Sequence, residues 1–300
     1  MHTRRRFLHL VTAASAAATT GSILRAQTRP ADPPWFKISL AQWSLNREFF
    51  GGQLDALDFA RIAKRDYGLA AIEYVNQFYR DKVTPATLTE LKSRSEGEGV
   101  RNVLIMCDGE GRLGDPDSAA RSRAVRNHLK WLEWARELGC HSIRVNAGST
   151  GSYEEQQRLA ADGLRSLCEL ADPFGLNVIV ENHGGLSSSG AWLAGVMREV
   201  NHPRCGTLPD FGNFRISPAE EYDRYRGTAE LMPWAKSVSA KTFAFDADGN
   251  ETTIDYPRIM RIVRDAGFRE YVGIEFEGPT AAPAGIRATK TLLERLGGTA

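Results

Sequence analysis

The sequence predicts an α/β fold, a (β/α)8 barrel that forms a single domain. Short apolar strands alternate with helical patterns, and eight such units fill the about 270 residues that follow the N-terminal segment. An open, doubly wound sheet would normally carry Gly-x-Gly-x-x-Gly after an early strand, and the loop at residues 44–53 (SLNREFFGGQ) lacks this motif. The chain has 300 residues, 42% of them hydrophobic, so it is long enough to bury one large core.

The N-terminal segment predicts export. Residues 3–9 read TRRRFLH, and a weakly apolar stretch of small residues with a short polar exit follows, which is typical of a secretory signal. The pair Arg4-Arg5 resembles the twin-arginine signal, which carries folded proteins. We expect residues 1–27 to be this signal peptide, residues 28–300 to be the barrel, and the mature protein to be periplasmic or otherwise exported. A general-secretion signal and a disordered basic arm are the alternatives.

Eight segments are predicted to be buried strands, because each is a short apolar run followed by a polar or glycine-containing loop. In chain order they are residues 36–43, 71–75, 102–107, 142–147, 177–182, 206–211, 237–243 and 272–278. Residues 177–182 (NVIVEN) illustrate the pattern, since a β-branched apolar core ends on Glu181 and Asn182. An acid is costly to bury without a partner, so its position at the end of a buried strand indicates a site.

Amphipathic helices separate these strands. Residues 118–138 carry an apolar stripe at helical spacing, and Gly139 provides the stop. The other clear helical patterns are residues 153–175, 189–200, 257–267 and 284–296. Strands that alternate with helices in this way favour parallel pairing and hence the barrel.

Charge and cysteine content exclude several classes of protein. The formal net charge is +1 and the charges are interleaved, so neither nucleic acid nor an acidic membrane is an expected partner. After the first thirty residues, no apolar run is long enough to span a bilayer. The four cysteines are not arranged as C-x-x-C, so we expect buried free thiols. They are Cys107, Cys140, Cys168 and Cys205.

Polar residues gather where the predicted strands end, and the eight loops of such a barrel converge there. They are Gln42, Glu73, Asp108, Glu110, Asn146, Glu181, His183, Asp210, Lys241, Glu275 and Glu277. The mouth of an eight-stranded barrel is only about 15 Å across, so several ionised carboxylates would repel one another unless a cation lies between them. We therefore expect a divalent metal held by Glu181, Asp210 and Glu275.

Other residues near these positions have plainer interpretations. Glu277 alternates with Glu275 but lies nearer the solvent, which favours a residue of the rim. His141 precedes its strand, so it should lie at the opposite end of the barrel and be structural.

Three motifs occur together in the second half of the chain. They are Glu-Asn-His-Gly at 181–184, Asp-Phe-Gly-Asn at 210–213 and Gly-Ile-Glu-Phe-Glu-Gly at 273–278. In this order they resemble the xylose-isomerase-like sugar isomerase/epimerase superfamily, and the resemblance extends over roughly residues 36–296.

The resemblance implies roles for these carboxylates. Glu181, Asp210 and Glu275 would be metal ligands, and the two glutamates would also form the acid/base pair that moves a proton beside a carbonyl. Many members of the superfamily supply a fourth ligand from a His-x-Lys pattern in the seventh strand. Here the pattern reads Ser239-Ala240-Lys241. Either His183 or water would then complete the shell, or the site binds its metal (Mn, Mg, Co or Zn) weakly or not at all.

These residue types predict a proton-transfer enzyme. A metal or Lys241 would polarise a sugar carbonyl and stabilise an enediolate, while Glu181 and Glu275 remove and return the proton. The expected partner is a small sugar or keto-sugar. Its binding residues are expected to be Trp43, Glu73, Arg144, Asn146 and His183. Tyr74 and Phe78 are further candidates for stacking on a sugar face.

Alternative functions use the same residues. If one glutamate protonates a leaving group on the next carbon, the enolate collapses by β-elimination, which would make a keto-sugar or keto-glycoside lyase or dehydratase. The exchange of histidine for Ser239 motivates a second alternative, a non-catalytic sugar-binding barrel. A metal-dependent nuclease of the related endonuclease barrel would need more histidines and a basic surface. A homo-oligomer is compatible with the sequence.

Overall fold

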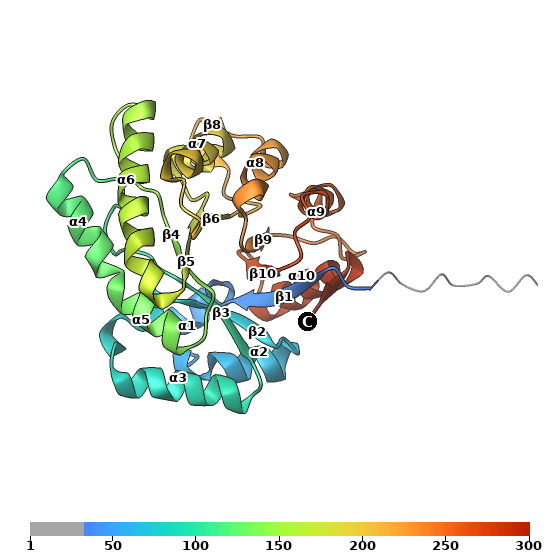
Figure 1. Cartoon of the computed structure of the whole chain (residues 1–300). Coiled ribbons are helices and arrows are strands. Elements are labelled where there is room, and N and C mark those ends of the chain that lie inside the picture. The colour runs from blue at the N-terminus through green and yellow to red at the C-terminus, as the bar shows by residue number, and fades with distance from the viewer. Residues whose placement is uncertain (1–32) are drawn as a thin grey trace, which may run out of the picture. The chain divides into compact units, whose positions relative to one another are not determined.

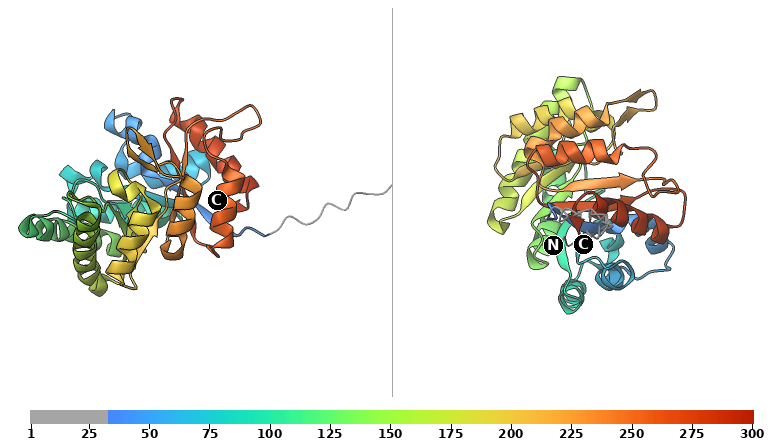
Figure 2. Two further views of the ribbon diagram at one scale, coloured as in Figure 1. Left: turned by 90° about the horizontal axis from the view of Figure 1, so that it is seen from above. Right: turned by 90° about the vertical axis from the view of Figure 1, so that its right-hand side faces the viewer.

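The computed structural model describes residues 33–300, in which a nearly closed barrel of eight parallel strands is surrounded by helices (Figures 1 and 2). The predicted (β/α)8 class is thereby confirmed. The predicted twin-arginine signal, residues 1–27, lies outside the described residues. Export therefore stays a prediction.

The barrel strands follow one another around the ring in chain order. They are β1 (Phe36–Ala41), β2 (Ala71–Val75), β3 (Arg101–Met106), β4 (Ser142–Val145), β5 (Asn177–Glu181), β6 (Cys205–Leu208), β9 (Val238–Thr242) and β10 (Tyr271–Phe276). From β1 to β6 each strand pairs in parallel with the next, β9 pairs with β10, and β10 pairs with β1. Two isolated bridges, Thr207–Ala235 and Asp210–Ser239, join the remaining pair, β6 and β9.

Helices cover the outside of the ring (Figure 1). They are α1 (Asn46–Phe50), α2 (Phe59–Tyr67), α3 (Pro85–Gly97), α4 (Ser118–Asn127), α5 (Leu129–Glu137), α6 (Tyr153–Ala171), α7 (Gly190–Val200), α8 (Arg224–Leu231), α9 (Tyr256–Asp265) and α10 (Ala282–Arg295). Several helices begin at a side chain that caps the first turn. At the start of α6, for example, the Ser152 hydroxyl accepts a hydrogen bond from the Glu155 N–H. Among residues 33–300, no helix has the length and apolar character that a membrane span requires.

Short strands complete the fold. A small antiparallel hairpin, β7 (Arg215–Ser217) and β8 (Glu220–Glu221), follows β6, and β11 (Gly298–Thr299) pairs with the start of β1. The core fills both the barrel interior and the space between strands and helices, where Trp131 and Trp192 are fully buried. All four cysteines are buried and unpaired, as expected.

Most predicted boundaries differ from the observed ones by one to four residues, and two differences have a clear physical reason. The helix predicted over residues 118–138 is two helices, because the chain tightens at His128, whose N–H bonds to the carbonyl three residues earlier, at Val125. The strand predicted over residues 206–211 ends at Leu208, because Pro209 has no N–H to donate. Its carbonyl still accepts a hydrogen bond from Ser239, which keeps the following residue beside β9.

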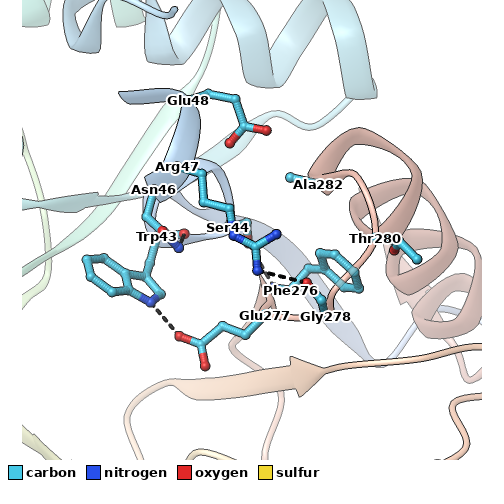
Figure 3. Close-up of a pocket in the computed structure, with 10 residues that line it drawn as sticks. All are labelled: Trp43, Ser44, Asn46, Arg47, Glu48, Phe276, Glu277, Gly278, Thr280 and Ala282. Carbon is cyan, nitrogen blue, oxygen red and sulfur yellow. Dashed lines mark hydrogen bonds between the residues drawn. The ribbon is translucent and has the colours of Figure 1, made fainter. Parts of the chain in front are cut away.

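A pocket of about 240 Å³ opens at the carboxyl-terminal face of the barrel (Figure 3). One wall comes from the residues that follow β1, including Trp43 and Arg47, and the other from the residues that follow β10, including Glu277. The Arg47 guanidinium donates a hydrogen bond to the Gly278 carbonyl and so joins the two walls. This is the end of the barrel at which the sequence predicts the site.

Candidate active site

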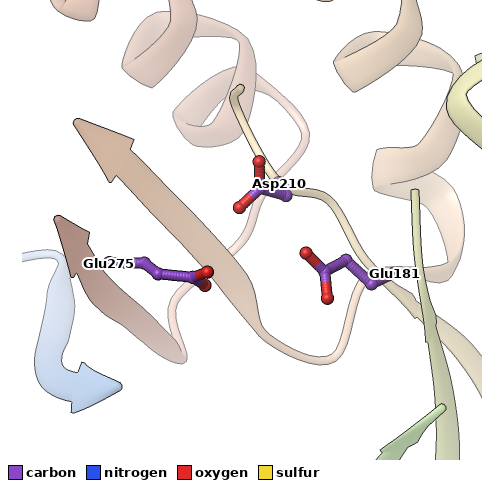
Figure 4. Close-up of side chains that lie close together, drawn as sticks. All are labelled: Glu181, Asp210 and Glu275. Atoms are coloured by element: carbon purple, nitrogen blue, oxygen red, sulfur yellow. The ribbon is translucent and has the colours of Figure 1, made fainter. Parts of the chain in front are cut away.

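Three buried carboxylates converge inside the mouth of the barrel (Figure 4). Glu181 ends β5, Asp210 follows β6 and Glu275 belongs to β10. One oxygen from each lies within 4.8 Å of those from the other two, and the residues are at most 3% exposed. The structure thus brings together the three residues that the sequence singles out.

The turn after β6 holds two of these carboxylates in place. Oδ1 of Asp210 accepts hydrogen bonds from the N–H groups of Gly212 and Asn213, and the Asp210 N–H donates to Asn182 Oδ1. The Asn213 amide then donates to Glu181 Oε1 over 2.8 Å. The Asp-Phe-Gly-Asn motif therefore orients both Asp210 and Glu181.

Lys241 places an ammonium group against the third carboxylate. Its Nζ lies 2.7 Å from Glu275 Oε1, 3.2 Å from Glu277 Oε2 and 3.7 Å from Asp210 Oδ2. Burial alone would lower the pKa of Lys241, but Asp210 and Glu275 raise it well above its usual value. Burial would likewise raise the pKa of Glu275, and the Lys241 ammonium instead holds it below the usual range. Lys241 and Glu275 are therefore a buried pair of opposite charges.

Ser239 occupies the position where the resemblance implies a histidine ligand. Its hydroxyl lies 2.6 Å from Asp210 Oδ2 and 2.9 Å from Glu275 Oε2. One hydroxyl has a single hydrogen to donate, so the second contact needs a proton on a carboxyl group or a cation nearby. Burial raises the pKa of Asp210 to about 8, although the Lys241 ammonium acts in the opposite direction. Asp210 is therefore the carboxyl group most suited to carry that proton.

Arg144 in β4 provides the second buried cation. Its guanidinium lies 2.7 Å from Asp108 Oδ1 and 2.8 Å from Glu181 Oε2. Burial would raise the pKa of Asp108, but Arg144 lowers it to about 2. The Asn146 amide donates to the same Asp108 oxygen. Arg144 and Asn146 thus lie beside the carboxylates, and their predicted contact with a sugar stays a prediction.

Two other predicted residues lie at the edge of the site. Trp43 is half-buried, and its indole N–H donates to the carboxylate of Glu277. His183 is exposed, and the three converging carboxylates form a group without it among the described residues. The structure therefore does not bring His183 to the proposed metal position. His141 directly precedes β4 and lies at the opposite end of the barrel, as expected.

Tyr74, a predicted candidate for stacking on a sugar face, is buried and packs against Phe59 and Tyr79, so that expectation is wrong. Glu73 also lies away from the mouth. It is fully buried, and its carboxylate accepts a hydrogen bond of 2.6 Å from Ser39. A side chain at Gly273 would clash with this carboxyl group, and Gly273 comes two residues before Glu275 on the same strand. The Glu73 carboxyl group therefore lies one layer below the three carboxylates, inside the barrel, so we correct the expectation that it contacts substrate.

The buried position of Glu73 should make stability depend on pH. Burial raises its pKa to about 8, despite the hydrogen bond from Ser39. The folded state then holds a proton that the unfolded chain releases above its ordinary pKa of 4.5, so stability falls as pH rises from about 4.5 to about 8. We expect Glu73→Gln to remove a penalty on the order of 5 kcal/mol at alkaline pH.

Urea unfolding at pH 5 and pH 9 checks this expectation. The Glu73→Gln variant should gain stability relative to the wild type at pH 9 and change little at pH 5. Glu96→Gln, at an exposed position of α3, is the matched control and should behave like the wild type at both pH values. Equal effects of Glu73→Gln at both pH values would contradict the proposed protonation.

The donor set fits a divalent cation that prefers oxygen. Five carboxyl groups lie within 4 Å of two cationic side chains. Asp210, Glu275 and Glu277 lie near Lys241. Asp108 and Glu181 lie near Arg144. In addition, Glu181 Oε2 is buried and makes no hydrogen bond within the described residues, since the nearby Arg144 N–H is not directed at it. A cation bound by Glu181, Asp210 and Glu275 would satisfy this oxygen and reduce the repulsion.

Sequence reasoning undervalued three residues of this site. Asn213 orients Glu181 and already stands in the Asp-Phe-Gly-Asn motif. Glu277 contacts Lys241, and its alternation with Glu275 is the signal that places both on one face. Ser239 is more than a missing histidine, because it links Asp210 to Glu275. Nothing in the residue pattern alone indicates that link.

A family model and a curated protein are similar to this sequence. The family model described as "Xylose isomerase-like TIM barrel" matches residues 61–296. A shorter similarity exists to the C-glycoside deglycosidase alpha subunit of Arthrobacter globiformis, with 35% identity over 75 residues, which are 25% of this chain. The matched stretch is only 20% of that relative's own length.

Solved structures share the fold. The 3-keto-D-glucoside 4-epimerase YcjR from E. coli superposes with a TM-score of 0.67 at 18% identity, over 87% of this chain and 99% of that one. D-Psicose 3-epimerase from Clostridium cellulolyticum H10, solved with D-tagatose, gives a TM-score of 0.69 at 12% identity, over 88% and 100% of the two chains. At these identities the likeness shows the shared fold.

Proposed function

The chain belongs to the xylose isomerase-like TIM barrel family, and from this premise we propose that it is an exported sugar isomerase or epimerase. Its substrate is a small keto-sugar, and the reaction moves the proton on the carbon beside the carbonyl through an enediolate. The observation that carries the proposal is the pair of buried glutamates from β5 and β10, which converge with Asp210 and have the Lys241 ammonium beside them.

Lys241 and the two glutamates divide the chemistry. The Lys241 ammonium keeps Glu275 ionised, so Glu275 is able to take a proton from the substrate carbon. The same ammonium can donate a hydrogen bond to the oxygen on which negative charge develops. Glu181 comes from a different strand and is assigned to the opposite face of the substrate, where it returns the proton.

A divalent cation fits the same position. Glu181, Asp210 and Glu275 would hold it, with water in place of the histidine that Ser239 replaces. When bound, it would act as a Lewis acid on the substrate carbonyl. The oxygen donors suit Mg or Mn, and Co or Zn would also accept them.

The substrate class follows from the residues around the carboxylates. Arg144 and Asn146, which both donate to Asp108 beside the mouth, are the donors assigned to sugar hydroxyls, and Trp43 offers an aromatic face at the pocket. Two epimerases with this fold are named for a 3-keto-glucoside and for psicose, which supports a keto-sugar.

Elimination is the second candidate, and Glu277 favours it. This residue is a further carboxyl group, 3.2 Å from Lys241 and partly exposed toward the pocket. An acid there could protonate a leaving group on the carbon next to the enolate, which then collapses with formation of an alkene. The limited similarity to a C-glycoside deglycosidase subunit supports this alternative.

Proton NMR in deuterated water tests the proposal. With added Mn²⁺ and methyl 3-keto-β-D-glucopyranoside or a free ketohexose, we expect deuterium to enter the carbon beside the carbonyl while the carbon skeleton is retained. Release of methanol with a new alkene signal would instead identify the lyase. Absence of both exchange and elimination would contradict an enzyme of this type and leave the sugar-binding barrel.

A further inference from the structure

An aromatic cluster made of Trp43, Phe50 and Phe78 lies at the carboxyl-terminal face of the barrel. Trp43 and Phe50 come from the segment after β1, and Phe78 from the segment after β2. The rings of Trp43 and Phe78 are stacked with their centres 6.5 Å apart, and the ring of Phe50 lies 4.9 Å from Phe78 and 6.1 Å from Trp43. The three rings thus form one continuous apolar surface.

Trp43 and Phe78 are partly exposed, and Phe50 is unusually open for an aromatic residue. Phe50 is 59% exposed, more than any other large hydrophobic residue in the described part of the chain. Phe49, Phe50 and Phe78 line a cavity of about 430 Å³. Leaving a phenyl ring in water forgoes about 1.5–3 kcal/mol of burial. An open cavity lined by such rings is suited to bind an apolar or aromatic ligand.

The aromatic cluster is connected to the proposed active site through Glu277. One oxygen of this carboxylate accepts the Trp43 indole N–H, and the other lies 3.2 Å from Lys241 Nζ. Trp43 also lines the pocket of about 240 Å³ that contains Glu277. A ligand that reached Lys241 through this pocket would therefore pass beside Trp43, whose ring contacts those of Phe50 and Phe78.

We propose that the aromatic cluster binds the aglycone of a phenolic glycoside whose oxidised sugar occupies the active site. This inference rests on the proposed function and narrows its substrate class to aryl keto-glycosides. Ring stacking on Phe50 and Phe78 supplies the contact. Asp55, Gln77 and Lys82 at the edge of the same cavity supply the hydrogen-bonding groups that phenolic hydroxyls require. A free monosaccharide would leave this surface uncovered.

The test compares two unreactive glucosides. Phenyl β-D-glucopyranoside and methyl β-D-glucopyranoside share the sugar and lack the keto group, so their binding can be measured by titration calorimetry without turnover. We expect the phenyl glucoside to bind about tenfold more tightly, the contribution of one good aromatic contact. Equal affinities, or no detectable binding of the phenyl glucoside, would overturn the proposal.

Variants locate the effect. Phe50→Ala should reduce phenyl glucoside affinity to that of the methyl glucoside and leave methyl glucoside affinity unchanged. Phe50 is largely exposed, so the fold does not depend on its ring. Tyr153→Ala, at another exposed aromatic residue, is the matched control and should keep the phenyl preference. An unchanged preference in Phe50→Ala would also overturn the aromatic subsite.

A separate readout distinguishes this inference from the proposed function. Deuterium exchange into methyl 3-keto-β-D-glucopyranoside depends on the carboxylates and Lys241, whereas the phenyl preference depends on Phe50. If exchange occurs without a phenyl preference, the aromatic subsite is wrong and the enzyme assignment stands. If the phenyl preference occurs without exchange or elimination, the aromatic subsite stands and the enzyme assignment is wrong.

Discussion

Replacing Glu275 by glutamine should lower the rate of solvent proton exchange into a keto-sugar by about 10³-fold or more. Glutamine has nearly the same shape, but its amide cannot accept the proton that the carboxylate of Glu275 would take. Single-turnover exchange followed by NMR in deuterated water measures the loss. Because glutamine keeps the shape of the side chain, any activity that depended only on this shape would persist.

The fold should tolerate this change. Lys241 keeps Glu277 at 3.2 Å and Asp210 at 3.7 Å as partners, so the buried ammonium is not left alone. Far-ultraviolet circular dichroism and the thermal midpoint check that the barrel is intact. Glu277→Gln is the matched control, since it removes a charge beside the same ammonium without removing the assigned base. The Glu277→Gln variant should slow exchange by less than about tenfold. Normal exchange in the Glu275→Gln variant would count against the acid/base role of Glu275.

The fold was predictable because its signal repeats. Each strand is a short apolar run, each helix has its own stripe, and the parallel order then follows from the connections. The convergence of Glu181, Asp210 and Glu275 was predictable for the same reason, since all three stand at strand ends and those ends meet at one face. No knowledge of side-chain packing was needed for either inference.

The depth and contacts of single residues were not predictable in this way. Glu73 also stands in a strand of the barrel, yet its carboxyl group points to the layer of Ser39 and Gly273 and is closed off from the mouth. His183 follows Glu181 by two residues, but the chain leaves the strand between them, so alternation no longer applies and His183 is exposed. Strand period gives the face of a residue only while the strand continues.

Replacing Lys241 by methionine should affect proton exchange and metal binding in opposite directions. Methionine keeps much of the apolar volume and removes the ammonium that lies 2.7 Å from Glu275. We expect exchange to slow by about 10²- to 10³-fold, because a donor to the developing oxyanion is lost. We also expect Mn²⁺ affinity to rise by about tenfold or more, because a cation no longer competes for Asp210 and Glu275. Calorimetry with Mn²⁺ alone measures the second effect without any substrate.

Two further variants test whether the change in Mn²⁺ affinity comes from the charge of Lys241. They are Asp210→Asn and Lys241→Arg. Asp210→Asn removes an assigned ligand and should weaken Mn²⁺ binding, whereas Lys241→Arg keeps the positive charge and should leave the affinity close to that of the wild type. The thermal midpoint should follow the same order, because a cation that binds only the folded state raises stability with the logarithm of its affinity. If Lys241→Met bound Mn²⁺ no better than the wild type, the ammonium and the cation would not share these carboxylates. Lys241 would then act on the substrate alone, and the three carboxylates would have to be balanced by their own protons and by Arg144.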